Sequence, residues 1–303
     1  MPKKALLIAN FRSGTGKAKT ALPDVIEILS KNDILCTVYV TRNKASTIET
    51  AMLATKEYDL LVAIGGDGTL SEIVNGVMRS EKNIPVGYIP TGSTNDLARS
   101  LGIPTNPKEG AEAIARMEPK KYDIGQFNDS FFHYIAATGA FTKAAYATNQ
   151  SLKNTLGHTA YVLEGIKSVS EIQKIRITGT TDKGSFDGEY LFCSISNSTS
   201  VGGFIHLDRG TVNFGDGLFE LCLISAPANG QDLMQLVGDL MQSNFDNKLI
   251  KLKQITYAEL TIPAATGWTL DGEDGGHQAT VSFSVYQKKL LLLSGSKKQT
   301  GGY

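Results

Sequence analysis

The sequence predicts a two-domain α/β protein, in which an N-terminal, mostly parallel sheet with helices on both faces precedes an antiparallel, β-sandwich-like domain. Two patterns predict this fold. Up to about residue 125, short apolar runs alternate with stretches of helical periodicity, the order of strands and crossover helices in a parallel sheet. Beyond that point, strand-like runs follow one another around turn residues, as in antiparallel sheets. The length of 303 residues agrees, because one core seldom grows beyond about 250–300 residues.

The N-terminal part contains four candidate strands, at residues 5–9, 35–40, 60–64 and 85–89. Helices are expected between them, at residues 21–30 and 70–79, and from a capping box at residues 46–49 onward. In such sheets, ligands bind beyond the carboxyl ends of the strands. Asn10, Thr41 and the loops that begin at Gly65 and Thr91 all follow strands, so we expect them at that edge.

The C-terminal part is expected to consist mainly of hairpins. Asn128-Asp129 and Asp182-Lys183-Gly184 each separate two apolar runs, which predicts two hairpins. Further strands are expected at residues 218–225, 254–262 and 279–286, and helices at residues 159–172 and 230–243. The apolar run at residues 289–293 is expected to return to the first domain. We therefore place the first domain at residues 1–125, with 288–303 returning to it, and the second at 126–287.

Composition and charge exclude several classes of protein. The 30 basic and 30 acidic residues give a formal net charge of zero, which argues against bulk electrostatic binding to nucleic acid. The three cysteines lie far apart and form no CxxC pair, which indicates reduced thiols in a cytoplasmic protein. The sequence contains no signal-like stretch and no apolar stretch long enough to span a membrane.

Gly65-Gly66-Asp67-Gly68-Thr69 follows the third strand and has the chemistry of a phosphate-binding loop. Glycines let backbone N–H groups approach phosphate closely, and the N-terminus of the following helix attracts anions. Asp67 can hold magnesium directly or through water. The loop lacks the GxxxxGK[ST] pattern of a Walker-type site. The alternative is a tight strand-to-helix turn with an aspartate cap.

Two further loops follow strands of the same expected sheet. Residues 10–17 carry Asn10, Ser13 and two glycines, and residues 91–96 carry hydroxyls, a glycine and Asp96 at a helix start. Taken singly, the first can be an ordinary loop before a helix and the second an N-cap. The occurrence of all three loops after strands of one sheet favours a shared nucleotide site.

These residues resemble the catalytic domain of the diacylglycerol kinase family, over nearly the whole chain. The matching motifs are Asn-x-x-Ser-Gly from Asn10, GGDGT from Gly65 and G-[ST]-x-N-D from Gly92. The later matches are Asp123-Ile124-Gly125, Asn213 with Asp216-Gly217-Leu218, and Asp271-Gly272-Glu273. The sequence departs from the motif of the family at Phe214-Gly215, between Asn213 and Asp216. The length is similar to that of the compact bacterial members.

The resemblance implies a fold like that of NAD kinases and diacylglycerol kinases, and ATP-dependent phosphorylation of a lipid hydroxyl, with diacylglycerol as the favoured acceptor. It implies magnesium, action at the membrane surface and a homodimer. The residues implied to bind the nucleotide are Asn10, Arg12, Ser13, Gly14, Thr41, Gly66, Asp67, Gly68, Thr69, Glu72 and Ser93. The implied catalytic magnesium network contains Asp67, Asp96 and Asp123. Glu273 is implied as the general base, and Asn213, Asp216 and Leu218 as ligands of a structural magnesium.

Other functions remain open on the sequence alone. NAD kinase shares the GGDG loop, a nucleotide-binding regulator without turnover is a third possibility, and sphingoid bases, ceramide, monoacylglycerol and undecaprenol are alternative lipid acceptors. Simple structural interpretations also remain for single residues: Asp123 can end a strand, Asp216-Gly217 can form a turn, and Glu273 can be an exposed strand residue after a hairpin turn. The four histidines lack ligand-like spacing and are expected to be structural or on the surface.

Overall fold

The structure, a computed structural model, divides the chain into two compact units, Met1–Ile124 with Gln287–Tyr303, and Gly125–Tyr286. It describes residues 1–13, 16–139, 174–198, 200–201, 205–206, 213–242, 244–263 and 266–295. None of the helices in these ranges is long and apolar enough to cross a membrane.

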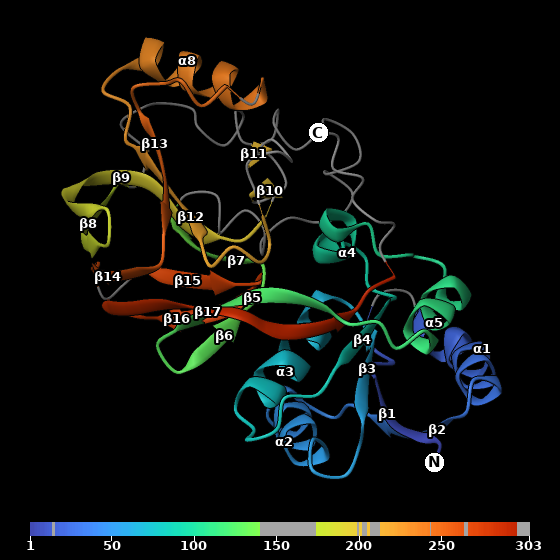
Figure 1. The fold of residues 1–303 in the computed structure, drawn as a ribbon. Helices are drawn as coiled ribbons and strands as arrows, with labels where there is room; N and C mark the ends of the chain where they lie inside the picture. Colours follow the sequence, from blue (N-terminus) through green and yellow to red (C-terminus); the bar gives the residue numbers. More distant parts are fainter. Residues whose placement is uncertain are drawn as a thin grey trace. The chain divides into compact units, whose positions relative to one another are not determined.

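The first unit is built on a parallel sheet (Figure 1), which confirms the fold class expected for this half. Its strand order is β4-β3-β1-β2. The strands are β1 (Lys3–Ala9), β2 (Ile34–Val40), β3 (Leu60–Gly65) and β4 (Val86–Pro90). The last residues of β17 (Thr280–Leu293) add a fifth parallel strand, because Leu292 pairs with Val86.

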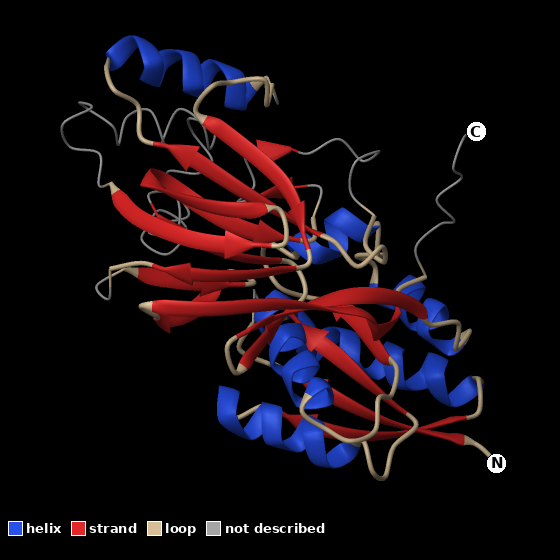
Figure 2. Cartoon of the chain, turned by 60° about the vertical axis from the view of Figure 1, so that its left-hand side comes forward, coloured by secondary structure: helices blue, strands red, loops and turns tan. Residues whose placement is uncertain are grey.

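Helices cover both faces of this sheet (Figures 1 and 2), as the alternating pattern predicts. On one face, α1 (Lys17–Lys31) packs with α5 (Pro107–Ala115), and their apolar residues join those of β1 and β3 in one core. On the other face, α2 (Lys44–Ala54) packs with α3 (Asp67–Met78). The short helix α4 (Asp96–Leu101) follows the loop after β4.

Three helix starts differ from the expected positions. Helix α1 begins at Lys17 and not at residue 21. The expected capping box at residues 46–49 is wrong, because the N-cap of α2 is Asn43, whose side chain accepts a 2.9 Å hydrogen bond from the backbone N–H of Ser46. An asparagine three residues earlier supplies the same acceptor, so the helix gains its first turn. Likewise, α3 begins at Asp67 and not at residue 70. The aspartate of the glycine loop therefore lies in the first turn of the helix.

The second unit consists mainly of antiparallel strands, as expected. Strand β9 lies at its centre, pairing with β7, β8 and β12, and the path β16-β15-β7-β9-β8-β14 continues to the first half of β17. The elements are β5 (Lys120–Phe127), β6 (Ser130–Phe132), β7 (Ile135–Gly139), β8 (Ile175–Thr181), β9 (Gly184–Ser196), β10 (Ser200–Val201), β11 (Ile205–His206), β12 (Phe219–Ser225), α8 (Gly230–Met241), β13 (Ile250–Ile255), β14 (Tyr257–Thr261), β15 (Gly267–Leu270) and β16 (Glu273–His277).

Both expected hairpins are confirmed, at Asn128-Asp129 between β5 and β6 and at Asp182-Lys183 between β8 and β9. The strand expected over residues 254–262 is instead two strands, β13 and β14. They separate at Thr256, whose backbone N–H donates to the carboxylate of Asp182 at 3.1 Å and not to a neighbouring strand. The helix expected at residues 159–172 lies outside the described residues.

The apolar run at residues 131–136, which follows the expected hairpin turn at Asn128-Asp129, is also interrupted. Strand β6 ends at Phe132 and β7 begins at Ile135, so His133 and Tyr134 lie between them and are both buried. Strands β15 and β16 were not expected from the sequence. Trp268 of β15 packs edge-on against Phe127, with a ring-centroid distance of 4.9 Å, so it is a core residue of this unit.

Candidate functional site

The loops that follow β1, β3 and β4 are held together at the carboxyl edge of the parallel sheet. The backbone N–H of Asn10 donates to the carbonyl of Ile64 at 2.9 Å, and that of Thr91 donates to the carbonyl of Gly65 at 2.8 Å. The first residue of each loop thus still pairs with the neighbouring strand, and the loop leaves the sheet after it. The edge expected from the strand–loop–helix order is the edge that carries these loops.

The first turn of α3 is arranged to bind an anion. Its N-cap, Gly66, is extended and offers no side-chain acceptor to the helix. The backbone N–H groups at the start of a helix have no acceptor within it, and the helix dipole adds partial positive charge there. Gly65 must lack a side chain, because a Cβ atom would lie 2.4 Å from the Thr69 hydroxyl oxygen. Phosphate oxygens are suitable acceptors for such a turn.

Gly66 and Gly92 bring two of the loops into direct backbone contact. A Cβ atom on Gly92 would lie 2.6 Å from the Cα of Gly66 and 2.8 Å from the side-chain oxygen of Asn95. That oxygen accepts a 3.1 Å hydrogen bond from the Gly92 backbone N–H. Neither loop can therefore keep its path with a larger residue at position 92.

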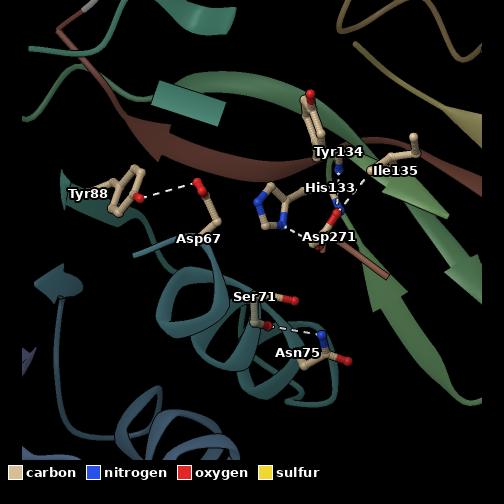
Figure 3. A network of polar contacts seen from close by, with 8 residues as sticks. All are labelled: Asp67, Ser71, Asn75, Tyr88, His133, Tyr134, Ile135 and Asp271. Atoms are coloured by element: carbon tan, nitrogen blue, oxygen red, sulfur yellow. Dashed lines mark hydrogen bonds and ion pairs between the residues drawn. The ribbon is translucent and has the colours of Figure 1, made fainter. Parts of the chain in front are cut away.

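The carboxylate of Asp67 connects the same two loops (Figure 3). One oxygen accepts the backbone N–H of Asp96 at 2.9 Å, and the other lies 3.3 Å from the hydroxyl of Tyr88. Burial, and then the negative charge of Asp67, raise the pKa of Tyr88, so its hydroxyl stays protonated and donates. Sequence reasoning missed Tyr88. Its only signal is a hydroxyl within the otherwise apolar strand that precedes the Thr91 loop.

Asn10 orders the first loop and connects it to α3. Its side-chain nitrogen donates to the hydroxyl of Thr69 at 3.2 Å, while its side-chain oxygen accepts the backbone N–H of Arg12 at 3.0 Å. The hydroxyl of Ser13 donates to the Asn10 carbonyl at 3.0 Å. The structure therefore brings Asn10 and Thr69, two of the expected nucleotide residues, into contact. Gly14 lies outside the described residues.

The other expected nucleotide residues take different places in the same unit. Ser93 is exposed on the loop before α4, and Gly68 and Glu72 lie half-buried in the first turns of α3. Thr41 follows β2, one strand farther along the sheet, and its backbone N–H donates to the carbonyl of Ala9 at 3.0 Å.

Asp123, expected in a magnesium network, is fully buried within β5. Its carboxylate accepts a 2.6 Å hydrogen bond from the backbone N–H of Lys288. Lys288 has a φ of 55°, in the left-handed region that is costly for most residues. Asp123 therefore has a structural role at this bend of β17. Its place in a magnesium network stays a prediction.

Glu273, in the second unit, lies at the start of β16 and is exposed. Asp271 and Gly272 form the two-residue turn before it, with φ values of 51° and 82°, and Leu270 pairs with Glu273 across the turn. Two successive positive φ values are typical of a type I′ hairpin turn. The expected turn at this position is confirmed, while the role of Glu273 stays a prediction.

The Asn213–Leu218 segment forms a compact turn before β12. The backbone N–H of Asp216 donates to the carbonyl of Asn213 at 3.4 Å, and the Asp216 carboxylate accepts the backbone N–H of Leu218 at 3.0 Å. Glu220 follows in β12 with only 4% of its surface exposed. Within the described residues, one of its carboxylate oxygens has no hydrogen-bond partner. Burial, and also the charge of Asp216, raise the pKa of Glu220 to about 7.

The described part of the chain contains no group of three or more His, Cys, Asp or Glu side chains that could hold a metal by themselves. Magnesium commonly uses only one or two carboxylates and completes its shell with water and phosphate oxygens. The donor set at Asp67 and Asp96 is therefore of a kind that magnesium uses together with a bound nucleotide.

The chain is similar in sequence to known proteins. The family model for the "Diacylglycerol kinase catalytic domain" matches residues 4–127. A diacylglycerol kinase of Staphylococcus epidermidis is 32% identical over 282 residues, which cover 91% of this chain and 87% of that protein. A diacylglycerol kinase of Bacillus subtilis is 29% identical over 276 residues, covering 90% and 91%.

Solved structures share the fold. The crystal structure of a diacylglycerol kinase from Bacillus anthracis superimposes with a TM-score of 0.76 at 22% sequence identity. The match covers 96% of this chain and 97% of that one. At this identity the likeness concerns the fold alone.

The contact between the two glycines leads to a first prediction. In Gly92→Ala, the new Cβ must push the loops apart, because the nearest atom, the Cα of Gly66, belongs to the backbone. Such overpacking typically costs about 1–3 kcal/mol. We expect a lower melting temperature and a loss of ATP affinity of roughly 5- to 150-fold in isothermal titration, since about 1.4 kcal/mol corresponds to tenfold.

Gly230→Ala is the matched control, because a Cβ at Gly230 meets nothing within 4 Å. It should bind ATP as the unmodified protein does. Unchanged ATP affinity in Gly92→Ala would show that the contact between the two loops does not shape a nucleotide site.

Proposed function

The chain belongs to the diacylglycerol kinase family and is a lipid kinase, and we propose that it transfers the γ-phosphoryl group of ATP to the free hydroxyl of diacylglycerol, forming phosphatidic acid. The kinase family implies ATP as the phosphoryl donor. The observation that carries the proposal is the meeting of the Gly66 and Gly92 loops at the N-terminus of α3, where backbone N–H groups can receive phosphates.

The nucleotide is proposed to bind along the carboxyl edge of the first unit. Its phosphates would lie against the start of α3, with Thr69 and Asn10 on one side and the Gly92 loop on the other. The hydrogen bond between Asn10 and Thr69 supports this placement, because it keeps both polar side chains at the edge of the loop. Phosphoryl transfer depends mainly on positioning and on neutralising charge, which a rigid set of donors supplies.

Asp67, Asp96 and Asp123 are the proposed residues of a catalytic magnesium network. Magnesium would neutralise charge on the β- and γ-phosphates and help to hold them in line with the acceptor. The fit rests on Asp67, which is half-buried and fixed from two directions, by Asp96 and by Tyr88. A carboxylate held in this way can bind a cation without first losing much side-chain freedom.

A second, structural magnesium is proposed at the turn before β12. Asp216 would contribute its carboxylate, and Asn213 and Leu218 their carbonyl oxygens. The buried carboxylate of Glu220 supports a cation here, because a partly unsatisfied buried oxygen beside another acid is costly unless positive charge is near. This cation would stabilise the fold of the second unit and take no part in chemistry.

Glu273 is the proposed general base, which would orient the acceptor hydroxyl and take its proton as the γ-phosphoryl group is transferred. Its exposed position after a rigid type I′ turn supports this role, because the carboxylate is accessible while its backbone is fixed. Since diacylglycerol resides in membranes, we also propose that the enzyme works at a membrane surface.

The direct test of the proposal is a phosphorylation assay with γ-labelled ATP, magnesium and a panel of acceptors in vesicles. The panel contains diacylglycerol, monoacylglycerol, a sphingoid base, ceramide and undecaprenol, with NAD as a soluble alternative. We expect label in phosphatidic acid. Label mainly in another lipid would replace the acceptor, and label in NAD would overturn the assignment to lipids.

Glu273→Gln provides the second prediction. The substitution keeps the size and removes the charge of the proposed base, so kcat for the best lipid should fall by about 10²–10⁴. ATP affinity should stay unchanged, because the proposed contact is with the acceptor. Turnover and ATP binding are measured on the same preparation.

Glu259→Gln serves as its control, since Glu259 is also an exposed strand residue of the second unit and should keep full turnover. Retained turnover in Glu273→Gln would remove the base assignment. Parallel loss of turnover and ATP binding would assign Glu273 to the nucleotide site.

The third prediction concerns the structural magnesium. Asp216→Asn keeps an oxygen for the Leu218 N–H and removes only the charge, so the turn survives. Without nucleotide, magnesium at about 100 times its dissociation constant should stabilise the unmodified protein by about 2.7 kcal/mol. The rise in melting temperature should be absent from Asp216→Asn and present in Asp246→Ala, an exposed acid outside the turn. Equal rises in all three proteins would exclude this site.

A further inference from the structure

Where the chain leaves β6 and before it enters β7, a buried network of polar contacts forms inside the second unit (Figure 3). At this point the carboxylate of Asp271 accepts three backbone N–H groups, from His133 at 3.2 Å, Tyr134 at 2.9 Å and Ile135 at 3.1 Å. The backbone N–H of Asp271 returns a 2.8 Å hydrogen bond to the Ile135 carbonyl. A sheet ladder does not account for this pattern, since the carboxylate replaces the partner strand.

One side chain, that of His133, joins this backbone network. Its Nδ1 lies 2.9 Å from a carboxylate oxygen of Asp271, and each side chain is only 1% exposed. Burial alone would raise the pKa of Asp271, but the charge and hydrogen bond of His133, with the backbone N–H groups, lower it instead. The charge of the His133 side chain therefore helps to keep the buried acid ionised.

Asp271 is also the first residue of the turn that carries Glu273. It has a φ of 51°, and Glu273 leaves the turn two residues later. A left-handed residue is tolerated where surrounding contacts fix it. The contacts to residues 133–135 fix Asp271 from the buried side, so they also fix the point from which the exposed Glu273 departs.

We propose that His133 is a positioning residue for Glu273: its Nδ1, 2.9 Å from a carboxylate oxygen of Asp271, holds that carboxylate, and the carboxylate sets the turn that presents Glu273 to the acceptor. The inference rests on the proposed role of Glu273 as base. His133 acts through Asp271 and touches neither the nucleotide nor the lipid.

Three substitutions separate this role from simple packing. Asparagine can place its side-chain N–H near the position of Nδ1, glutamine places it near that of Nε2, and leucine has no donor. A misplacement of about 1 Å at a reacting group can cost about 10²-fold in rate. We therefore expect kcat to fall about 10–100-fold in His133→Leu and His133→Gln and to stay within about threefold in His133→Asn. The KM for ATP should be unchanged in all three.

Hydrogen–deuterium exchange of the peptide covering residues 131–136 gives a readout that does not need activity. Exchange should accelerate in His133→Leu and His133→Gln and stay slow in His133→Asn. If the leucine variant does not fold, the asparagine and glutamine variants decide, since both are polar and differ in donor position.

A packing role predicts the opposite order, because asparagine is the smallest of the three and leaves the largest cavity. That order, or full kcat in all three variants while Glu273→Gln is inactive, would overturn the inference alone. Full turnover in Glu273→Gln would overturn both the base assignment and this inference, so the two failures are distinguishable.

Discussion

The proposed nucleotide site depends on a single close approach, that of the Gly66 and Gly92 backbones. With a Cβ at Gly92 only 2.6 Å from the Gly66 Cα, no other residue type fits there without moving a loop. The approach places Asp96 where its N–H reaches the carboxylate of Asp67 at 2.9 Å. It therefore orients both the start of α3, the proposed phosphate site, and the acid proposed to hold magnesium. The hydrogen bonds of Asn10 and Tyr88 at the carboxyl edge of the sheet add to an arrangement of loops that the two glycines determine.

The second unit uses a different constraint for a similar purpose. A buried carboxylate, Asp271, takes the place of a partner strand and fixes the turn before Glu273. Buried charge is unfavourable unless it is paired and fully hydrogen-bonded, so such an arrangement tolerates little movement. In both units, then, an acid that is itself hydrogen-bonded fixes a proposed functional group. Asp67 is held by the Asp96 N–H and the Tyr88 hydroxyl at the edge of a sheet, and Asp271 is held by three backbone N–H groups in the turn between β15 and β16.

Much of this organisation could be predicted from the sequence, because short local sequence patterns determine it. The four parallel strands, the loops at their carboxyl ends, the hairpin at Asn128 and the turn at Asp271 follow from apolar runs and turn residues. The interruption at His133 could not be predicted, since Phe131 to Ala136 is an unbroken strand-like run whose partner is an aspartate 138 residues away from His133. Tyr88 was missed for the same reason: its role depends on a tertiary contact, not on sequence spacing.

The central claim is that the loops at residues 65–72 and 91–97 receive the phosphates of ATP. Hydrogen–deuterium exchange with and without ATP and magnesium tests it most directly, because it follows backbone N–H groups at both loops at once. The account predicts that exchange slows in both segments when ATP binds, while the edge strand at residues 34–40 is unchanged. ATP binding, verified by titration, without slower exchange in either loop would contradict it.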